Sequence, residues 1–336
     1  GEENIFEKDI PKDIEYFFLK PEKLIRETEK YKVRKKNIVY KLMYNLMMEK
    51  ENRIMYKNMQ QILKKLGEID IVIDFDGGAS KYIEKLDIKK KIVWIHNSIP
   101  NLKKKEGKIK RFGKRLEKYD RVVAICDEMK EEIENIYPNL KGKVSRIYNP
   151  FNFERIEKLM EDKSELTKEQ IKMLEEDYCI AISRLDVIQK DYDTLLKSFK
   201  ILKDKGIEQK LYIIGDGPSK KIIEEWIKEY QLENLVFLLG RMKNPYVWLK
   251  NSNFFIHSSK FEGFGLVLVE AGYSGKVVIS SRCPVGPRDI LKEGKCGILF
   301  EVGNEEELAD SIEKILKNQE LKKEYENLIK ERVKEF

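Results

Sequence analysis

The chain has 336 residues, with 66 Lys and Arg against 59 Asp and Glu, two histidines and four cysteines. This length accommodates two domains of roughly 100–200 residues each, and a hydrophobic content of 41% excludes a disordered chain. Two histidines argue against a multi-histidine zinc or iron site. The four cysteines form no Cys-x-x-Cys pair, which predicts reduced thiols and a cytoplasmic protein.

The charge is distributed unevenly along the chain. Residues 1–150 contain 35 Lys and Arg against 25 Asp and Glu, a net charge of +10, which leaves −3 for the remainder of the total of +7. No stretch approaches the ~20 consecutive apolar residues of a membrane-spanning helix. The imbalance predicts an anionic partner that meets the first half of the chain.

Two stretches of the first half are strongly basic. Residues 32–41 are cationic and lead into Leu42–Met48, whose methionines we interpret as core residues. Residues 103–115 hold eight Lys and Arg, interrupted by Ile109 and Phe112. An anionic membrane surface is the expected partner of the 103–115 cluster, because each basic residue near such a surface adds about 1 kcal/mol. Nucleic acid is not expected, since no known nucleic-acid-binding module accompanies the charge.

Four apolar runs of the first half read as strands of a parallel sheet. They are Ile71–Ile73, Ile92–Ile95, Arg121–Ile125 and Lys143–Tyr148, and the first three read as buried. Gly77-Gly78 and His96-Asn97-Ser98 follow two of these runs, at the edge where α/β sheets place ligands. A Rossmann-like domain opens with a strand, a glycine-rich turn and a helix, and none precedes Ile71. We therefore expect the first domain to lack its initial βαβ unit.

Strands and helices alternate regularly in the second half. The predicted strands are Cys179–Ile182, Lys210–Ile214, Leu235–Leu239, Phe254–Ile256, Val277–Ile279 and Gly297–Phe300. Helices are predicted over 193–202 and 219–230 and after Asn304, a plausible N-cap. This alternation is typical of a doubly wound parallel sheet. Because residues 152–176 are helical and charged, we predict two α/β domains, spanning 1–155 and 156–336.

The segment from Phe261 to Glu270 is the most informative motif. Gly263 and Gly265 allow close approach of a ligand to the backbone, and the residues that follow enter a helix whose N–H groups attract phosphate. Glu270, eight positions after Glu262, lies about two turns inside that helix. Such a carboxylate can accept both hydroxyls of a ribose. Either glutamate alone could be a cap or a solvated residue, but the pair around Gly-x-Gly favours function.

A second motif follows the first strand of the second half. Arg184 and Lys190, six residues apart, lie in the loop after Cys179–Ile182. Arg184 could hold a diphosphate by bidentate hydrogen bonds, and Lys190 could act as a point charge. A solvated basic pair is the alternative, but the carboxyl end of a strand favours ligand binding.

Taken together, these motifs resemble glycosyltransferase family 4, the retaining nucleotide-sugar-dependent transferases of the GT-B fold. The resemblance rests on Arg184 and Lys190, the Gly215-Asp216-Gly217-Pro218 turn, and the Glu262/Glu270 pair, in that order and spacing. The segment 283–300 is similar to that of the family members that assemble polysaccharides and lipid-linked oligosaccharides. The resemblance to the family implies two Rossmann-like domains facing across a cleft, the first on the acceptor side and the second binding the donor.

The resemblance also implies roles for individual residues. Arg184 and Lys190 match the positions that bind the donor diphosphate and stabilise it as it leaves. Glu262 matches the carboxylate beside the donor sugar, and Glu270 the ribose-binding carboxylate. His96, which directly follows an apolar strand, matches the histidine that reaches the donor sugar. The remaining expected donor-binding residues are Gly215, Arg241, Met242, Gly263, Phe264, Gly265 and Leu266.

No divalent metal is expected in this mechanism, because protein cations and helix N–H groups would stabilise the leaving diphosphate. Asp74-Phe75-Asp76 is the only aspartate-rich candidate for a metal site. A strand end turning into Gly77-Gly78 is the favoured interpretation of that segment.

The predicted function is retaining transfer of a sugar from a nucleotide diphosphate sugar, with UDP as the expected nucleotide. The expected acceptor is lipid-linked or an oligosaccharide in cell-surface glycan synthesis, at the inner face of the plasma membrane. Two alternatives stay open: an inactive pseudo-transferase that still binds nucleotide sugar, and a nucleotide-sugar epimerase of the same fold. A glycosidase would also use two carboxylates, but it would have no use for a diphosphate clamp.

Overall fold

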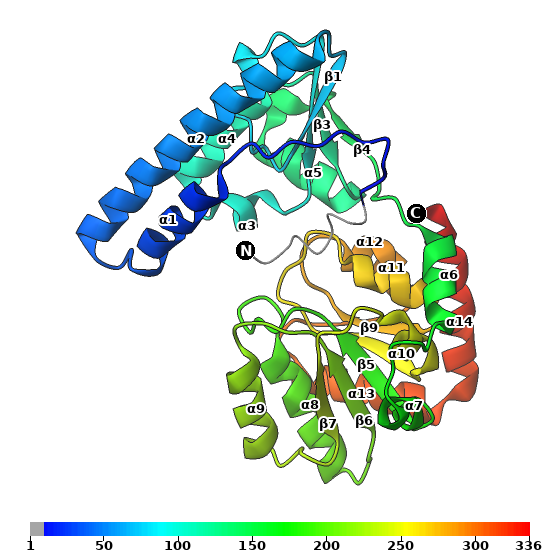
Figure 1. Cartoon of the computed structure of the whole chain (residues 1–336). Helices are drawn as coiled ribbons and strands as arrows, with labels where there is room; N and C mark the ends of the chain where they lie inside the picture. Colours follow the sequence, from blue (N-terminus) through cyan, green and yellow to red (C-terminus); the bar gives the residue numbers. More distant parts are fainter. Residues whose placement is uncertain (1–9) are drawn as a thin grey trace. The chain divides into compact units, whose positions relative to one another are not determined.

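The computed structural model describes residues 10–336, which divide into two units. The first unit comprises residues 1–93 with 118–120, and the second comprises 94–117 with 121–336. Figure 1 shows the elements of both. This division follows contacts within the chain and differs from the predicted domain limits, 1–155 and 156–336, which stay a prediction.

The first unit begins with a helical hairpin that the sequence analysis did not predict (Figure 1). Helix α1 spans Glu22–Val33, and α2 spans Ile38–Leu66. The Asn37 side chain caps α2 by accepting a hydrogen bond of 2.9 Å from the backbone N–H of Val39. The basic stretch 32–41 and the apolar residues that follow it thus lie at the outer end of a hairpin.

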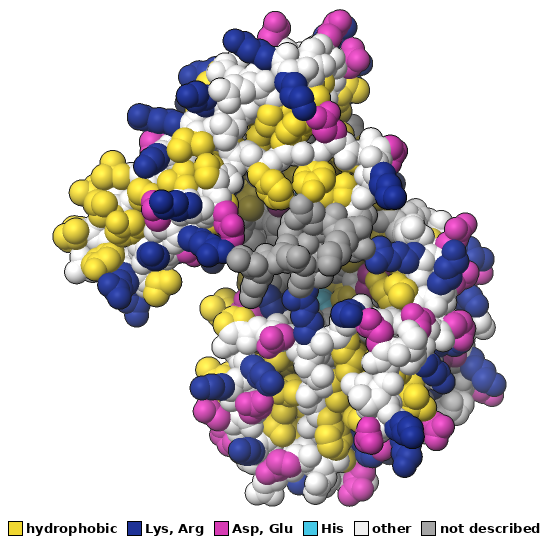
Figure 2. Space-filling view, viewed as in Figure 1, with side chains coloured by type: hydrophobic (Ala, Val, Ile, Leu, Met, Phe, Trp, Pro, Cys, Tyr) yellow, Lys and Arg dark blue, Asp and Glu magenta, His cyan; other side chains and the backbone are white. Residues whose placement is uncertain are grey.

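The methionine-rich stretch 42–48 is not a core segment, which corrects the prediction. Its three methionines are only partly buried, and Leu42 and Leu46 are exposed. Hydrophobic side chains gather over this end of the hairpin together with Lys and Arg (Figure 2). The segment is helical, as part of α2, but its leucines point to the surface.

A four-stranded sheet follows, in the order β1-β2-β3-β4. Its strands are β1 Ile71–Phe75, β2 Lys90–Ile95, β3 Arg121–Ala124 and β4 Val144–Arg146. All four predicted strands are confirmed, but the prediction that the Ile71–Ile73 run is buried is wrong. Ile71 and Ile73 are 49% and 45% exposed, because β1 is an edge strand.

The second unit contains a six-stranded parallel sheet in the order β10-β9-β8-β5-β6-β7. Its strands are β5 Tyr178–Ile182, β6 Lys210–Ile214, β7 Val236–Gly240, β8 Phe254–His257, β9 Val277–Ser281 and β10 Ile298–Phe300. Counted from β5, the order is 3-2-1-4-5-6, that of a doubly wound dinucleotide-binding sheet. The predicted α/β fold with parallel strands is confirmed.

Helices cover both faces of the six-stranded sheet (Figure 1). Leu196 of α8, Ile223 of α9 and Ile312 of α13 belong to one continuous buried core with the strands. On the other face, α11 and α14 contact β9. The helices of this unit are α3 Ile99–Lys103, α4 Glu106–Leu116, α5 Asp127–Ile136, α6 Phe153–Glu161, α7 Lys168–Met173, α8 Tyr192–Asp204, α9 Lys220–Glu229, α10 Tyr246–Asn251, α11 Leu266–Tyr273, α12 Pro287–Ile290, α13 Glu305–Lys317 and α14 Gln319–Arg332.

The helical character predicted for 152–176 is confirmed by α6 and α7, and Asn304 caps α13 as expected, accepting from the backbone N–H of Glu307 at 3.0 Å. The structure describes no helix in residues 10–336 with the length and apolar character needed to cross a bilayer.

Candidate functional site

The strand order places two loops side by side between β5 and β8, the point from which successive strands are added in opposite directions. β5 pairs with β6 on one side and with β8 on the other, so the loops after β5 and β8 leave the sheet together. Lys190 of the first loop forms an antiparallel bridge with Ser259 of the second, and the Lys260 N–H donates to the Gln189 carbonyl at 2.7 Å. Doubly wound sheets bind ligands at such a reversal.

The Lys190 ammonium and the Glu262 carboxylate form an ion pair across these two loops. Both side chains are largely buried, at 15% and 8% exposure. Burial alone would raise the pKa of Glu262, but hydrogen bonding to His257 and the charge of Lys190 lower it to about 2. The predicted residues Lys190 and Glu262, distant in sequence, therefore meet as one charged pair.

His257, the last residue of β8, contacts the Glu262 carboxylate. Its Nε2 lies 3.0 Å from Glu262 Oε1, and its Nδ1 lies 3.2 Å from the Ser280 hydroxyl. Burial lowers the pKa of His257, which favours the neutral ring. A neutral His257 with its proton on Nε2 can donate to Glu262 while Nδ1 accepts from Ser280.

The loop from Gly263 to Gly265 leads directly into α11, as predicted. Gly265 occupies the position before the helix, with φ +88°, a conformation that favours glycine. A Cβ on Gly263 would lie 2.1 Å from the backbone carbonyl oxygen of His96, in the same unit. His96 and the loop are therefore brought together. Phe264 is buried, whereas Leu266, the first residue of α11, is 46% exposed.

Glu270 is the fifth residue of α11, about one turn into the helix rather than the predicted two, and it accepts a hydrogen bond of 3.1 Å from the Tyr246 hydroxyl. Burial raises the pKa of Glu270, partly offset by this hydrogen bond. The two glutamates of the motif thus have opposite electrostatic environments. Glu262 is held as an anion, and Glu270 is easier to protonate.

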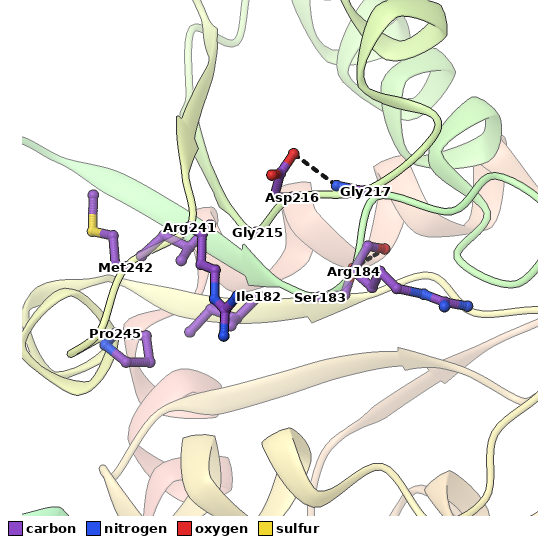
Figure 3. A pocket seen from close by; sticks show the side chains of 10 residues that line it. Ile182, Ser183, Arg184, Gly215, Asp216, Gly217, Arg241, Met242 and Pro245 are labelled. Carbon is purple, nitrogen blue, oxygen red and sulfur yellow. Dashed lines mark hydrogen bonds between the residues drawn. The ribbon is translucent and has the colours of Figure 1, made fainter. Parts of the chain in front are cut away.

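A pocket of about 460 Å³ opens at the carboxyl ends of β5, β6 and β7 (Figure 3). Its lining includes four residues predicted from the sequence, Arg184, Gly215, Arg241 and Met242. Gly215 allows the loops after β5 and β6 to touch, since a Cβ there would lie 1.9 Å from the Ser183 carbonyl oxygen.

Arg184 is engaged within its own loop. Its Nη2 donates to Asp186 Oδ2 at 2.6 Å, and its side chain is 63% exposed. Figure 3 shows the guanidinium extending away from Arg241 and Met242. A bound anion would therefore compete with Asp186 for Arg184. This ion pair was not predicted, although the aspartate two residues after Arg184 could have indicated it.

Asp74, at the end of β1, is held by the turn that follows it and by a tyrosine. Asp74 accepts from the Ala79 N–H at 3.0 Å and from the Tyr119 hydroxyl. Within residues 10–336 no three His, Cys, Asp or Glu side chains are grouped as a metal site. Tyr246, the partner of Glu270, was not predicted either, because no local pattern marks it.

Comparison with known proteins extends this picture. The family model "Glycosyl transferases group 1" matches residues 154–332. An uncharacterised glycosyltransferase of Methanocaldococcus jannaschii is 32% identical over 280 residues, covering 73% of this chain and 68% of that protein. The chain belongs to the group 1 glycosyltransferases. The matched segment contains every predicted site residue of this group 1 chain except His96.

A second relative is an N-acetylgalactosaminyltransferase of Campylobacter jejuni that acts on a diphospho-undecaprenol-linked acceptor. It is 30% identical over 222 residues, which cover 65% of this chain and 57% of that enzyme. This group 1 chain therefore spans little more than half the length of some of the relatives it matches.

Solved structures of glycosyltransferases share the fold. The Anabaena protein HepE in complex with UDP superimposes with a TM-score of 0.68 at 16% identity, covering 84% of this chain and 77% of HepE. TarM superimposes with a TM-score of 0.69 at 22% identity, covering 84% of this chain and 55% of TarM. These neighbours support the GT-B class predicted for this group 1 glycosyltransferase.

Proposed function

We propose that the chain transfers a sugar, with retained configuration, from a nucleotide diphosphate sugar to an acceptor. The observation that carries this proposal is the buried Lys190–Glu262 pair at the sheet reversal, beside a pocket lined by Arg184 and Arg241. A glycosidase needs no such cluster of cations. A leaving diphosphate, which accumulates negative charge, does.

Each site residue receives a role in this proposal. Arg241 and Met242 hold the base, largely through their backbone, and Glu270 accepts the ribose hydroxyls. Lys190, with Arg184 released from Asp186, binds the diphosphate. The loop at Gly263 and Gly265 contacts sugar and phosphate through its N–H groups.

The proposed reaction follows from the charges. As the sugar–phosphate bond breaks, positive charge develops on the sugar carbon and negative charge on the diphosphate. Lys190 and Arg184 stabilise the diphosphate without a divalent metal, and the Glu262 carboxylate lies beside the sugar with His96. The leaving phosphate takes the proton of the acceptor on the same face, which retains the configuration.

UDP is the proposed nucleotide, and a lipid-linked or oligosaccharide acceptor is proposed by analogy with the named relatives. HepE binds UDP-glucose in one solved complex, and relatives include a capsular polysaccharide glycosyltransferase of Staphylococcus aureus. We propose the same broad setting here, cell-surface glycan synthesis on the inner face of the plasma membrane.

The basic cluster 103–115 is the proposed electrostatic contact with that membrane. Lys104, Lys105, Lys108 and Lys110 are exposed, whereas Phe112 is buried. Helix α4 therefore offers charge without apolar surface, and its attraction to anionic lipid should weaken as salt is raised.

Titration calorimetry with UDP-glucose and UDP-N-acetylglucosamine tests the donor site. Glu270→Gln and Arg184→Ala should each weaken binding about 10-fold or more, since a charged hydrogen bond contributes about 1.5–3 kcal/mol. EDTA should change neither binding nor turnover. Glu229→Gln and Arg121→Ala are the matched controls, because both residues are exposed and lie outside the site.

Unchanged affinity in both site variants would contradict the proposed donor site. Tight binding without hydrolysis or transfer of the sugar would instead identify a pseudo-transferase, and release of an epimerised sugar would identify an epimerase.

A further inference from the structure

The outer end of the α1–α2 hairpin carries an exposed apolar ridge. Ile38, Val39, Leu42 and Leu46 are 81%, 62%, 60% and 57% exposed. Their spacing places them on one face of α2 over about 12 Å. Val33, the last residue of α1, is also exposed. Large apolar side chains grouped in this way usually mark a binding surface rather than a scatter of surface residues.

Cations surround this ridge, and of these only Lys32 has a carboxylate partner in the described residues, Glu29 at 2.8 Å. Residues 30–48, which we call the hairpin tip, contain six Lys and Arg and no Asp or Glu. The cations are Lys30, Lys32, Arg34, Lys35, Lys36 and Lys41. A surface that is both apolar and predominantly positive is complementary to a surface that offers hydrocarbon beneath anionic groups.

Two tyrosines of the hairpin tip contact its basic side chains. The Arg34 guanidinium lies 5.6 Å from the ring centroid of Tyr40 and donates to its hydroxyl at 3.2 Å, and the Lys35 ammonium lies 5.6 Å from the centroid of Tyr44. Tyrosine is enriched where protein meets the headgroup region of a bilayer, because its ring is apolar and its hydroxyl polar.

We propose that the hairpin tip binds an anionic lipid bilayer, with the apolar ridge inserted at the level of the headgroups and the cations on lipid phosphates. This adds an apolar anchor to the electrostatic contact at 103–115, and it rests on the proposed membrane partner but not on the donor site. An interfacial helix needs an apolar face with basic residues beside it, which the tip has and α4 lacks.

Two other occupants fit less well. A second copy of the tip would bring six more cations against the first six, and the Glu29 carboxylate beside Lys32 offsets only one charge in each copy. Nucleic acid would engage the cations but would leave Leu42 and Leu46 in water, so it gives no reason for the ridge. A bilayer satisfies both features at once.

Co-sedimentation with vesicles of phosphatidylcholine containing about one third phosphatidylglycerol tests the proposal. Leu42→Glu with Leu46→Glu should weaken binding at least 10-fold. Ile222→Glu, an exposed isoleucine on α9, should leave it unchanged. Leu42→Trp, which keeps the ridge apolar, should bind at least as well as the parent. Circular dichroism and UDP-glucose binding in solution confirm that the variants are folded.

Neutralisation of the cations in 103–115 separates the two membrane contacts. The tip should keep residual binding in about 0.5 M salt, where purely electrostatic contacts are screened. Undiminished vesicle binding of the double glutamate variant would overturn the proposal, and so would loss of all binding on neutralising 103–115 alone. A dimer in sedimentation that dissociates on Leu42→Glu with Leu46→Glu would assign the ridge to a second copy instead. UDP-glucose binding is unaffected by any of these outcomes, so the donor site is judged separately.

Discussion

His257, Glu262 and Lys190 act as one unit at the centre of the site. Glu262 receives a hydrogen bond from a buried histidine on one side and an ion pair from a lysine on the other. Removing either partner would leave a buried carboxylate undercompensated, which is costly. His257 thus becomes a positioning residue, because it fixes the Glu262 carboxylate without facing the pocket that opens after β5 and β6.

The pH dependence of donor binding should report on Glu270. Because its pKa is raised, the carboxylate that accepts the ribose hydroxyls is lost by protonation at a higher pH than usual. UDP-glucose affinity should therefore fall as the pH is lowered into the weakly acidic range, and the fall should begin at a higher pH than for an ordinary glutamate. Glu262, with a pKa of about 2, stays ionised over this range.

The measurement is calorimetry with UDP-glucose, whose diphosphate does not change charge over these pH values. Glu270→Gln should bind weakly with a flat profile. A variant profile that declines as steeply as that of the parent would assign the titration to another group.

The sequence predicted which loop and helix carry the candidate site residues better than it predicted the contacts between their side chains. The spacing of Glu262 and Glu270 indicated their helix and loop correctly. The pairing of Lys190 with Glu262 could not be predicted, because it joins residues 72 positions apart through the strand order. The Arg184–Asp186 pair depends on the rotamers of two loop side chains, which residue identity does not determine.

Among the elements, the loops after β5 and β6 depend on each other. Gly215 has φ +152°, and the space its Cβ would need is occupied by the Ser183 carbonyl. These loops form one wall of the pocket that Arg184 and Arg241 line. Their close approach therefore fixes the width of the proposed donor site.

Gly215→Ala should destabilise the protein by about 1–3 kcal/mol and weaken UDP-glucose binding, since the added methyl group forces the loops apart. Gly206→Ala is the matched control. It also has a positive φ, +76°, but nothing lies within 4 Å of its Cβ position. Chemical denaturation and calorimetry of both variants measure the difference. Equal donor affinity would show that the approach of the two loops does not shape the site.

Strands were predicted more reliably than their burial. The six strands of the β5–β10 sheet follow the predicted runs within a few residues, because apolar runs between helical stretches favour parallel strands. β1 has the same kind of sequence and yet exposes Ile71 and Ile73. An edge position is a property of the sheet, and no local pattern encodes it. The α1–α2 hairpin was missed because its apolar residues were assigned to a core.

At the scale of the whole molecule, the cysteines are confined to the second unit. Cys126, Cys179, Cys283 and Cys296 are buried and unpaired, and all four lie in that unit. Burial raises the pKa of Cys126 and of Cys283 to about 12. The four thiols are thus inert by position.

Reaction with a thiol reagent should accordingly be negligible in the native protein and reach all four cysteines in denaturant. As denaturant is added, the thiol signal should follow the unfolding of the second unit, measured in parallel by circular dichroism. Rapid native labelling of any cysteine would contradict the burial described here. Saturating UDP-glucose should shift the thiol transition to higher denaturant, because a ligand stabilises the unit that binds it.

The strand order has a consequence for biosynthesis. β5 is the first strand of its sheet to be made, yet its neighbour β8 follows some 70 residues later, after β6 and β7. Until β8 emerges, the ammonium of Lys190 has no carboxylate opposite it and the loop after β5 has no second wall. Contacts this distant in sequence form late in folding. A nascent chain would therefore acquire its charged centre in a single late step, so no partly made domain would hold a competent site.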